Sequence, residues 1–127
     1  MPKKILIVDD EVVVVRLIKN VLESVGYKVA TAYDGQEALE KAVSEQPDLI
    51  VMDIRMPKMD GYTAMLFIKQ IREATGDLPE IPIIVCTAVH NPDVRELIEK
   101  EEVKDYIIKP IEVEELIEKI KKVFAEN

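Results

Sequence analysis

The chain alternates short apolar runs with longer segments in which apolar residues recur at helical spacing. The runs predict five strands, at residues 5–9, 29–31, 49–53, 83–87 and 106–108. Runs that are apolar at almost every position are typical of strands buried on both faces, which occur in parallel sheets covered by helices. The alternation therefore predicts an α/β fold with one parallel sheet between two helical layers.

Each predicted strand is followed by a segment whose apolar residues share one helical face. The predicted faces are Val14, Ile18, Val21, Leu22 and Val25; Ala38, Leu39, Ala42 and Val43; Ala64, Phe67, Ile68 and Ile71; Val94, Leu97 and Ile98; and Val113, Leu116, Ile117, Ile120 and Phe124. Gly26 is expected to end the first of these helices, and Thr75-Gly76-Asp77 is expected to end the third. The chain thus contains five strand–helix units.

Length and composition narrow the class of protein. The 127 residues suffice for one domain, with 48% hydrophobic and 33% charged residues. No apolar run approaches the roughly 20 residues of a membrane helix, and acidic residues from Asp9 onward interrupt the first run too early for a signal peptide. We therefore expect a cytoplasmic protein that makes no membrane contact.

The net charge of −8 repels nucleic acid phosphates, so direct nucleic acid binding is not expected. A single cysteine, Cys86, excludes an internal disulfide, and one cysteine with one histidine makes a zinc site a poor interpretation.

Polar residues gather where the predicted strands end: Asp9 and Asp10 after the first strand, Asp53 after the third, Thr87 after the fourth and Lys109 after the fifth. The carboxyl ends of parallel strands meet at one edge of a sheet, where such folds bind ligands. Three carboxylates gathered there would repel one another unless a cation lay between them. Oxygen ligands favour Mg²⁺ or Ca²⁺ over zinc, so the pattern predicts a divalent cation site.

Four segments carry a resemblance to a known family: IVDDE at 7–11, DIRMPKMDG at 53–61, Thr87-Ala88, and DYIIKP at 105–110. Together they resemble the response-regulator receiver family of two-component signalling. The resemblance spans nearly the whole chain, so we expect residues 1–127 to be a single receiver domain. It implies a three-layer (βα)5 fold of the flavodoxin-like, CheY-like kind, whose five-stranded parallel sheet has the order 2-1-3-4-5.

The resemblance also implies roles for the residues at the strand ends. Asp53 would be the phosphoacceptor. The expected cofactor is Mg²⁺, bound directly by Asp10, directly or through water by Asp9, and further by Asp53 and the backbone carbonyl of Arg55. Lys109 would contact a phosphoryl oxygen.

Further implied features concern signalling. The Thr87 hydroxyl would contact another phosphoryl oxygen, and Tyr106 would be the aromatic switch that turns inward when Thr87 moves toward the phosphate. The Lys109–Pro110 peptide is expected to be cis.

By the same resemblance, the phosphoryl donor would be a sensor histidine kinase or a phosphotransfer protein. The chain would not be an enzyme in the usual sense, because it would catalyse only its own phosphorylation and dephosphorylation. A downstream protein would bind the surface of the fourth helix, fifth strand and fifth helix. We expect a stand-alone response regulator; the alternative is a receiver from a larger response regulator or hybrid kinase.

Other classes fit less well. A haloacid-dehalogenase-type phosphatase needs an Asp-x-Asp pattern after the first strand, where this chain has adjacent aspartates. A flavin-binding module needs a phosphate loop that Asp9 and Asp10 would repel. A scaffold that is never phosphorylated would not need the full set of polar residues.

The chain departs from the family pattern at 101–103, where Glu-Glu-Val replaces a usual Gly-Ala pair. His90 is expected to be an exposed loop residue.

Overall fold

The computed structural model describes residues 2–53, 61–76, 81–87 and 103–126. Within them the chain forms a five-stranded parallel sheet with the order β2-β1-β3-β4-β5. The elements are β1 (Lys4–Val8), α1 (Val12–Ser24), β2 (Lys28–Ala32), α2 (Gly35–Glu45), β3 (Leu49–Asp53), α3 (Gly61–Thr75), β4 (Ile83–Thr87), β5 (Asp105–Ile108) and α5 (Val113–Ala125). This confirms the predicted fold class and strand order.

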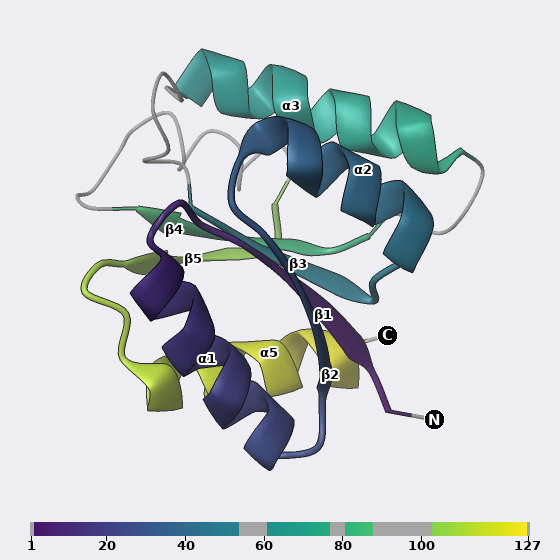
Figure 1. Cartoon of the computed structure of the whole chain (residues 1–127). Helices are drawn as coiled ribbons and strands as arrows, with labels where there is room; N and C mark the ends of the chain where they lie inside the picture. Colours follow the sequence, from purple (N-terminus) through teal and green to yellow (C-terminus); the bar gives the residue numbers. More distant parts are fainter. Residues whose placement is uncertain (1, 54–60, 77–80, 88–102, 127) are drawn as a thin grey trace.

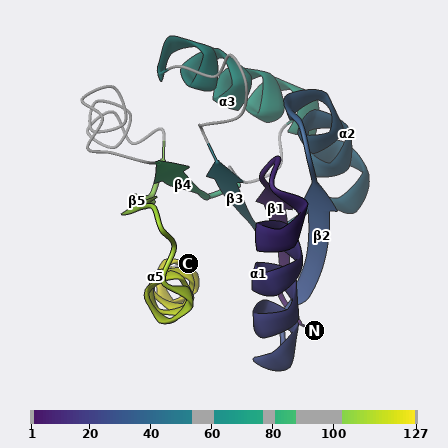
Figure 2. The same ribbon diagram turned by 60° about the vertical axis from the view of Figure 1, so that its left-hand side comes forward.

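The helices lie in two layers, with α2 and α3 on one side of the sheet and α1 and α5 on the other (Figures 1 and 2). Because successive side chains of a strand point to opposite faces, each strand contributes to two cores. In β1, Leu6 and Val8 join the core under α2 and α3, while Ile5 and Ile7 join the core under α1 and α5. The three inner strands are therefore buried on both faces, as their apolar runs predict.

Helix α1 buries a slightly different face from the predicted one. Val15, Ile18 and Leu22 are buried, whereas Val14 is only partly buried and Val25 is 46% exposed. The run of four valines at 12–15 has no polar residue to show which one faces the core, and Val25 lies just beyond the end of the helix.

The end of α1 follows the prediction. Gly26 has a φ of 102°, a left-handed conformation that glycine adopts at low cost. Its N–H donates to the Glu23 carbonyl and the next N–H, of Tyr27, donates to the Leu22 carbonyl, both at 3.1 Å. This pair of hydrogen bonds is the Schellman motif, which satisfies carbonyls left free at a helix end. Gly76, with a φ of 70°, directly follows α3, and its N–H donates to the Glu73 carbonyl at 3.3 Å.

Two other helices show smaller differences from prediction. In α2, Ala38 and Ala42 are buried but Val43 is 47% exposed. In α5, Val123 is buried with Leu116 and Ile120, while Phe124 is only partly buried at the rim of the core.

The predicted helix around Val94, Leu97 and Ile98 and the residue His90 lie outside the described residues, as do Glu101 and Glu102. Val103, at the end of the departing segment, is buried under α2 and α3.

None of the helices in the described part of the chain is both long and apolar enough to span a membrane.

Candidate functional site

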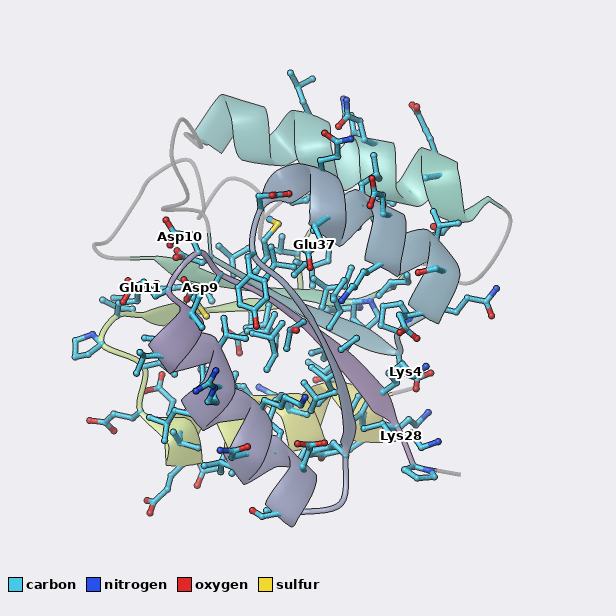
Figure 3. All side chains as sticks on the ribbon, viewed as in Figure 1. Lys4, Asp9, Asp10, Glu11, Lys28 and Glu37 are labelled. Carbon is cyan, nitrogen blue, oxygen red and sulfur yellow. The ribbon has the colours of Figure 1, made fainter. Side chains whose placement is uncertain are left out.

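The carboxyl edge of the sheet brings together an acid from β1 and an acid from β3. Asp9 directly follows β1, and Asp53 is the last residue of β3. The two strands are neighbours, with Val8 opposite Met52, so the next residue on each strand places the two acids side by side. Both are almost fully buried, at 2% exposure. Figure 3 shows Asp9, Asp10 and Glu11 together at this end of the sheet.

Lys109 joins the two buried acids. Its Nζ lies 2.7 Å from Asp53 Oδ2 and 3.2 Å from Asp9 Oδ2, and only 10% of its side chain is exposed. The alternation of side chains along each strand explains why the three residues come together. Asp9, Asp53 and Lys109 each lie two positions after a strand residue that faces α1 and α5, so their side chains point to that same face. The ammonium group thus lies between two carboxylates in a largely water-free place.

The pKa of Lys109 reflects this position. Burial alone would lower it, because it disfavours the charged ammonium. Hydrogen bonds and charge interactions with Asp53 and Asp9 outweigh burial, so the pKa of Lys109 is raised above 10.5. The lysine is therefore a firmly charged cation at neutral pH.

The second oxygen of Asp9 is also occupied. Asp9 Oδ1 accepts a hydrogen bond of 3.0 Å from the Glu11 backbone N–H. Sequence reasoning did not identify this contact, because an adjacent pair of acids gives no sign of which carboxylate turns back to the backbone. Asp10, by contrast, is exposed.

The acids can supply a cation site. One carboxylate oxygen each from Asp9, Asp10 and Asp53 lie within 4.8 Å of one another. Three carboxylates at this spacing match the all-oxygen ligand sets of Mg²⁺ and Ca²⁺. The donor chemistry therefore fits the predicted Mg²⁺, and Lys109 already places one positive charge against the two buried acids.

The other predicted residues are placed in part. Thr87 is the last residue of β4 and pairs with Ile108 in the sheet, but its side chain, like all of Arg55, lies outside the described part. Tyr106 in β5 is partly buried and packs against the core under α2 and α3. The Lys109–Pro110 peptide bond is cis.

Cys86 lies closer to the site than sequence reasoning indicated. It pairs with Asp53 in the register of β3 and β4 and is 1% exposed. Burial, followed by the negative charge of Asp53, raises the pKa of the Cys86 thiol to about 12. The thiol is therefore a neutral core group beside the phosphoacceptor candidate.

A groove of about 450 Å³ adjoins Lys109. Its wall is formed by the start of α1 and by the segment after β5, and it is lined by Glu11, Val14, Leu17, Ile18, Lys109, Pro110, Ile111 and Val113. Leu17, at its rim, is 58% exposed. An open, mainly apolar surface therefore borders the acidic site.

Comparisons with known proteins agree on one family. Residues 5–121 match the family described as response regulator receiver domain. Chemotaxis protein CheY of Bacillus subtilis is 38% identical over 123 residues, which cover 96% of this chain and 98% of CheY. The solved structure of chemotaxis protein CheY4 of Vibrio cholerae is 30% identical, with a TM-score of 0.82 over 97% of this chain and 99% of CheY4.

Longer proteins are similar as well. The alkaline phosphatase synthesis transcriptional regulatory protein PhoP of Bacillus subtilis is 41% identical over 127 residues, which cover 100% of this chain and 50% of PhoP. The probable transcriptional regulator ycf27 of Cyanophora paradoxa is 40% identical over 121 residues, 94% of this chain and 47% of that protein. The chain spans about half the length of these regulators.

Proposed function

From the premise that this chain belongs to the response regulator receiver family, we propose that it accepts a phosphoryl group on Asp53. The observation that carries the proposal is the position of Lys109, whose Nζ lies 2.7 Å from Asp53 Oδ2 in a buried site. A buried lysine charge beside a buried carboxylate is suited to stabilise the negative charge that phosphorylation adds there.

The transfer needs positioning and neutralised charge more than covalent help from other groups. A carboxylate oxygen of Asp53 attacks phosphorus, the bond from phosphorus to the donor nitrogen breaks, and its electron pair leaves with that nitrogen. Lys109 then turns from the carboxylate to a phosphoryl oxygen. The reacting carboxylate of Asp53 is almost fully buried, as is Asp9 beside it, so little water reaches the reacting group.

Asp9, Asp10, Asp53 and the carbonyl of Arg55 would hold the Mg²⁺. The cation would supply neutralisation of the phosphoryl oxygens during transfer. Asp10, the exposed member of the set, is the acid most free to bind it, since both oxygens of Asp9 already accept hydrogen bonds.

The signalling step belongs to the same proposal. Thr87, at the end of β4, would contact the phosphoryl group, and Tyr106 would change its packing in response. Tyr106 is suited to a switch because it is only partly buried against the core under α2 and α3, so part of its side chain is left to bury when it turns inward. The affected surface would include β5 and α5 and would bind a downstream protein.

The proposed donor is a sensor histidine kinase or a phosphotransfer protein. The apolar groove beside Lys109 gives such a protein a surface to contact next to Asp53. Similarity over nearly the full length of CheY agrees with a stand-alone regulator, and similarity to half of PhoP agrees with a receiver of a larger one. We favour the stand-alone regulator and place it in the cytoplasm.

Thermal unfolding with Mg²⁺ and beryllofluoride, a mimic of the phosphoryl group, tests the proposal. Mg²⁺ should raise the midpoint by relieving repulsion among the acids, with a stabilisation of roughly 2.7 kcal/mol at 100 times its Kd. Beryllofluoride should raise the midpoint further in the presence of Mg²⁺.

The matched variants are Asp53→Asn and Asp48→Asn. Asp48 precedes β3 and is exposed, at the opposite end of the same strand. Asp53→Asn should lose the beryllofluoride increment and Asp48→Asn should keep it. An equal increment in Asp53→Asn and in the unaltered chain would disprove the assignment of Asp53.

A further inference from the structure

Among the described residues, strand β2 forms one edge of the sheet, so half of its backbone groups have no neighbouring strand there. The Lys28 N–H and the Ala32 C=O form hydrogen bonds of 2.9 and 3.1 Å with backbone on the β1 side. Because backbone groups alternate in direction along a strand, those of Val29, Thr31 and Tyr33 point away from β1. Such a row of outward-pointing groups is a template for pairing with another chain.

Two charged side chains of α2 occupy part of this row. Lys41 Nζ donates to the Thr31 carbonyl at 2.8 Å, and the Tyr33 N–H donates to Glu37 Oε2 at 3.4 Å. The other Glu37 oxygen, Oε1, lies 3.6 Å from Lys41 Nζ. One lysine and one carboxylate therefore connect two outward backbone groups that an added strand would need.

The two side chains are held in place rather than loosely exposed. The Glu37 backbone N–H donates to Asp34 Oδ1 at 2.7 Å, which fixes the first turn of α2 next to β2. Glu37 and Lys41 are one helical turn apart, with side chains only 32% and 36% exposed. Figure 3 shows Glu37 where α2 begins, close to the end of β2.

We propose that Glu37 and Lys41 form an edge latch that prevents β2 from pairing with β2 of a second copy of this chain. The sequence of β2 itself offers little other protection against pairing with another strand. Its sequence, KVATA, has no proline and only one charged residue, at its first position. Two such edges could pair about a twofold axis and join two sheets into one, so a second copy is the partner that this edge fits.

Sedimentation velocity of Lys41→Met tests the edge latch. This variant keeps most of the side-chain length and removes the donor to Thr31. Lys69→Met is the control, since Lys69 is an exposed lysine of α3 and its loss changes the net charge equally. We expect Lys41→Met to self-associate at least tenfold more tightly than either the unaltered chain or Lys69→Met.

Amide hydrogen exchange identifies the surface that is used. The amides of Val29 and Thr31 point outward and should exchange rapidly in the unaltered chain. In Lys41→Met they should exchange at least tenfold more slowly as the protein concentration rises. Self-association no stronger than that of Lys69→Met, or association without this protection, would overturn the proposal.

A second pair of variants keeps the test decisive if Lys41→Met does not fold. Glu37→Gln removes the charge that holds Lys41, whereas Glu40→Gln changes an exposed residue of the same helix. Glu37→Gln should self-associate more tightly than Glu40→Gln, with the same protection of Val29 and Thr31. Equal monomeric behaviour of the two would reject the latch.

Discussion

At the scale of single residues, Lys109 is expected to have a large effect on stability. Its ammonium group lies between Asp9 and Asp53, which are both 2% exposed. Removing one partner of a buried ion pair leaves uncompensated charge, which costs about 3–5 kcal/mol. Lys109→Met should therefore lower the free energy of unfolding by about that amount, measured by urea unfolding without Mg²⁺.

Lys119→Met is the control for this change. Lys119 pairs with Asp105 at 3.0 Å, but their side chains are 25% and 28% exposed. Water screens such a pair, so the expected loss is about 0–1 kcal/mol. Mg²⁺ should also restore more stability to Lys109→Met than it adds to the unaltered chain. Losses of equal size in the two variants would show that the buried site does not depend on the charge of Lys109.

The raised pKa of Lys109 predicts how this difference depends on pH. Burial opposes the charge, but Asp53 and Asp9 raise the pKa above the 10.5 of an unperturbed lysine. A raised folded-state pKa gives stability that is complete below the unfolded value and is lost as pH rises through the folded value. The stability gap between the unaltered chain and Lys109→Met should thus be constant from neutral pH up to pH 10.5 and shrink above it. Urea unfolding of both proteins across this pH range measures the gap. A gap that widened as pH rose would contradict a raised pKa for Lys109 in the folded chain.

At the scale of elements, the end of α1 provides a test of one glycine. Gly26 has a φ of 102°, and an added Cβ would meet nothing within 4 Å. Gly26→Ala should therefore cost only the strain of a left-handed backbone, about 1–2 kcal/mol. Gly35→Ala, in the first turn of α2, is the control and should be neutral or slightly stabilising. Thermal unfolding of the two variants measures the difference, and equal midpoints would refute this account of the helix end.

The elements also show how far sequence reasoning reaches. The strands were predictable, because runs such as Leu49–Asp53 are apolar at every position before the final acid. The order of the strands in the sheet was implied only by the family resemblance, and the structure confirms it. The buried face of α1 was less predictable, since a run of valines at 12–15 leaves the choice between Val14 and Val15 to packing. Side-chain contacts between residues far apart in the sequence could not be predicted. Lys41 reaching the Thr31 carbonyl depends on where α2 crosses the sheet edge, which no local pattern encodes.

The same limit applies to the candidate site. The positions of Asp9, Asp53 and Lys109 at the strand ends were predictable from the chain. That Lys109 would touch both acids was not, because it follows from the neighbouring strands and from side-chain direction. The register that sets Cys86 beside Asp53 is equally a property of the assembled sheet.

At the scale of the whole molecule, the sheet couples two cores that lie on its opposite faces. Every inner strand contributes to both, so neither core can open without loosening the strands that support the other. Cys86 belongs to the core under α1 and α5 and reports on this coupling, because its thiol is 1% exposed. Its pKa of about 12 leaves almost no reactive thiolate while the chain is folded.

Labelling of Cys86 by a thiol reagent should therefore require global unfolding. The free energy of opening obtained from the labelling rate should equal the free energy of unfolding from urea titration and fall with urea at the same slope. Ser44→Cys in a Cys86→Ala background is the control, because Ser44 is exposed on α2 and should react at once. Labelling of Cys86 that did not vary with urea would instead reveal a local opening beside Asp53. The site would then be able to open while the rest of the sheet stays folded.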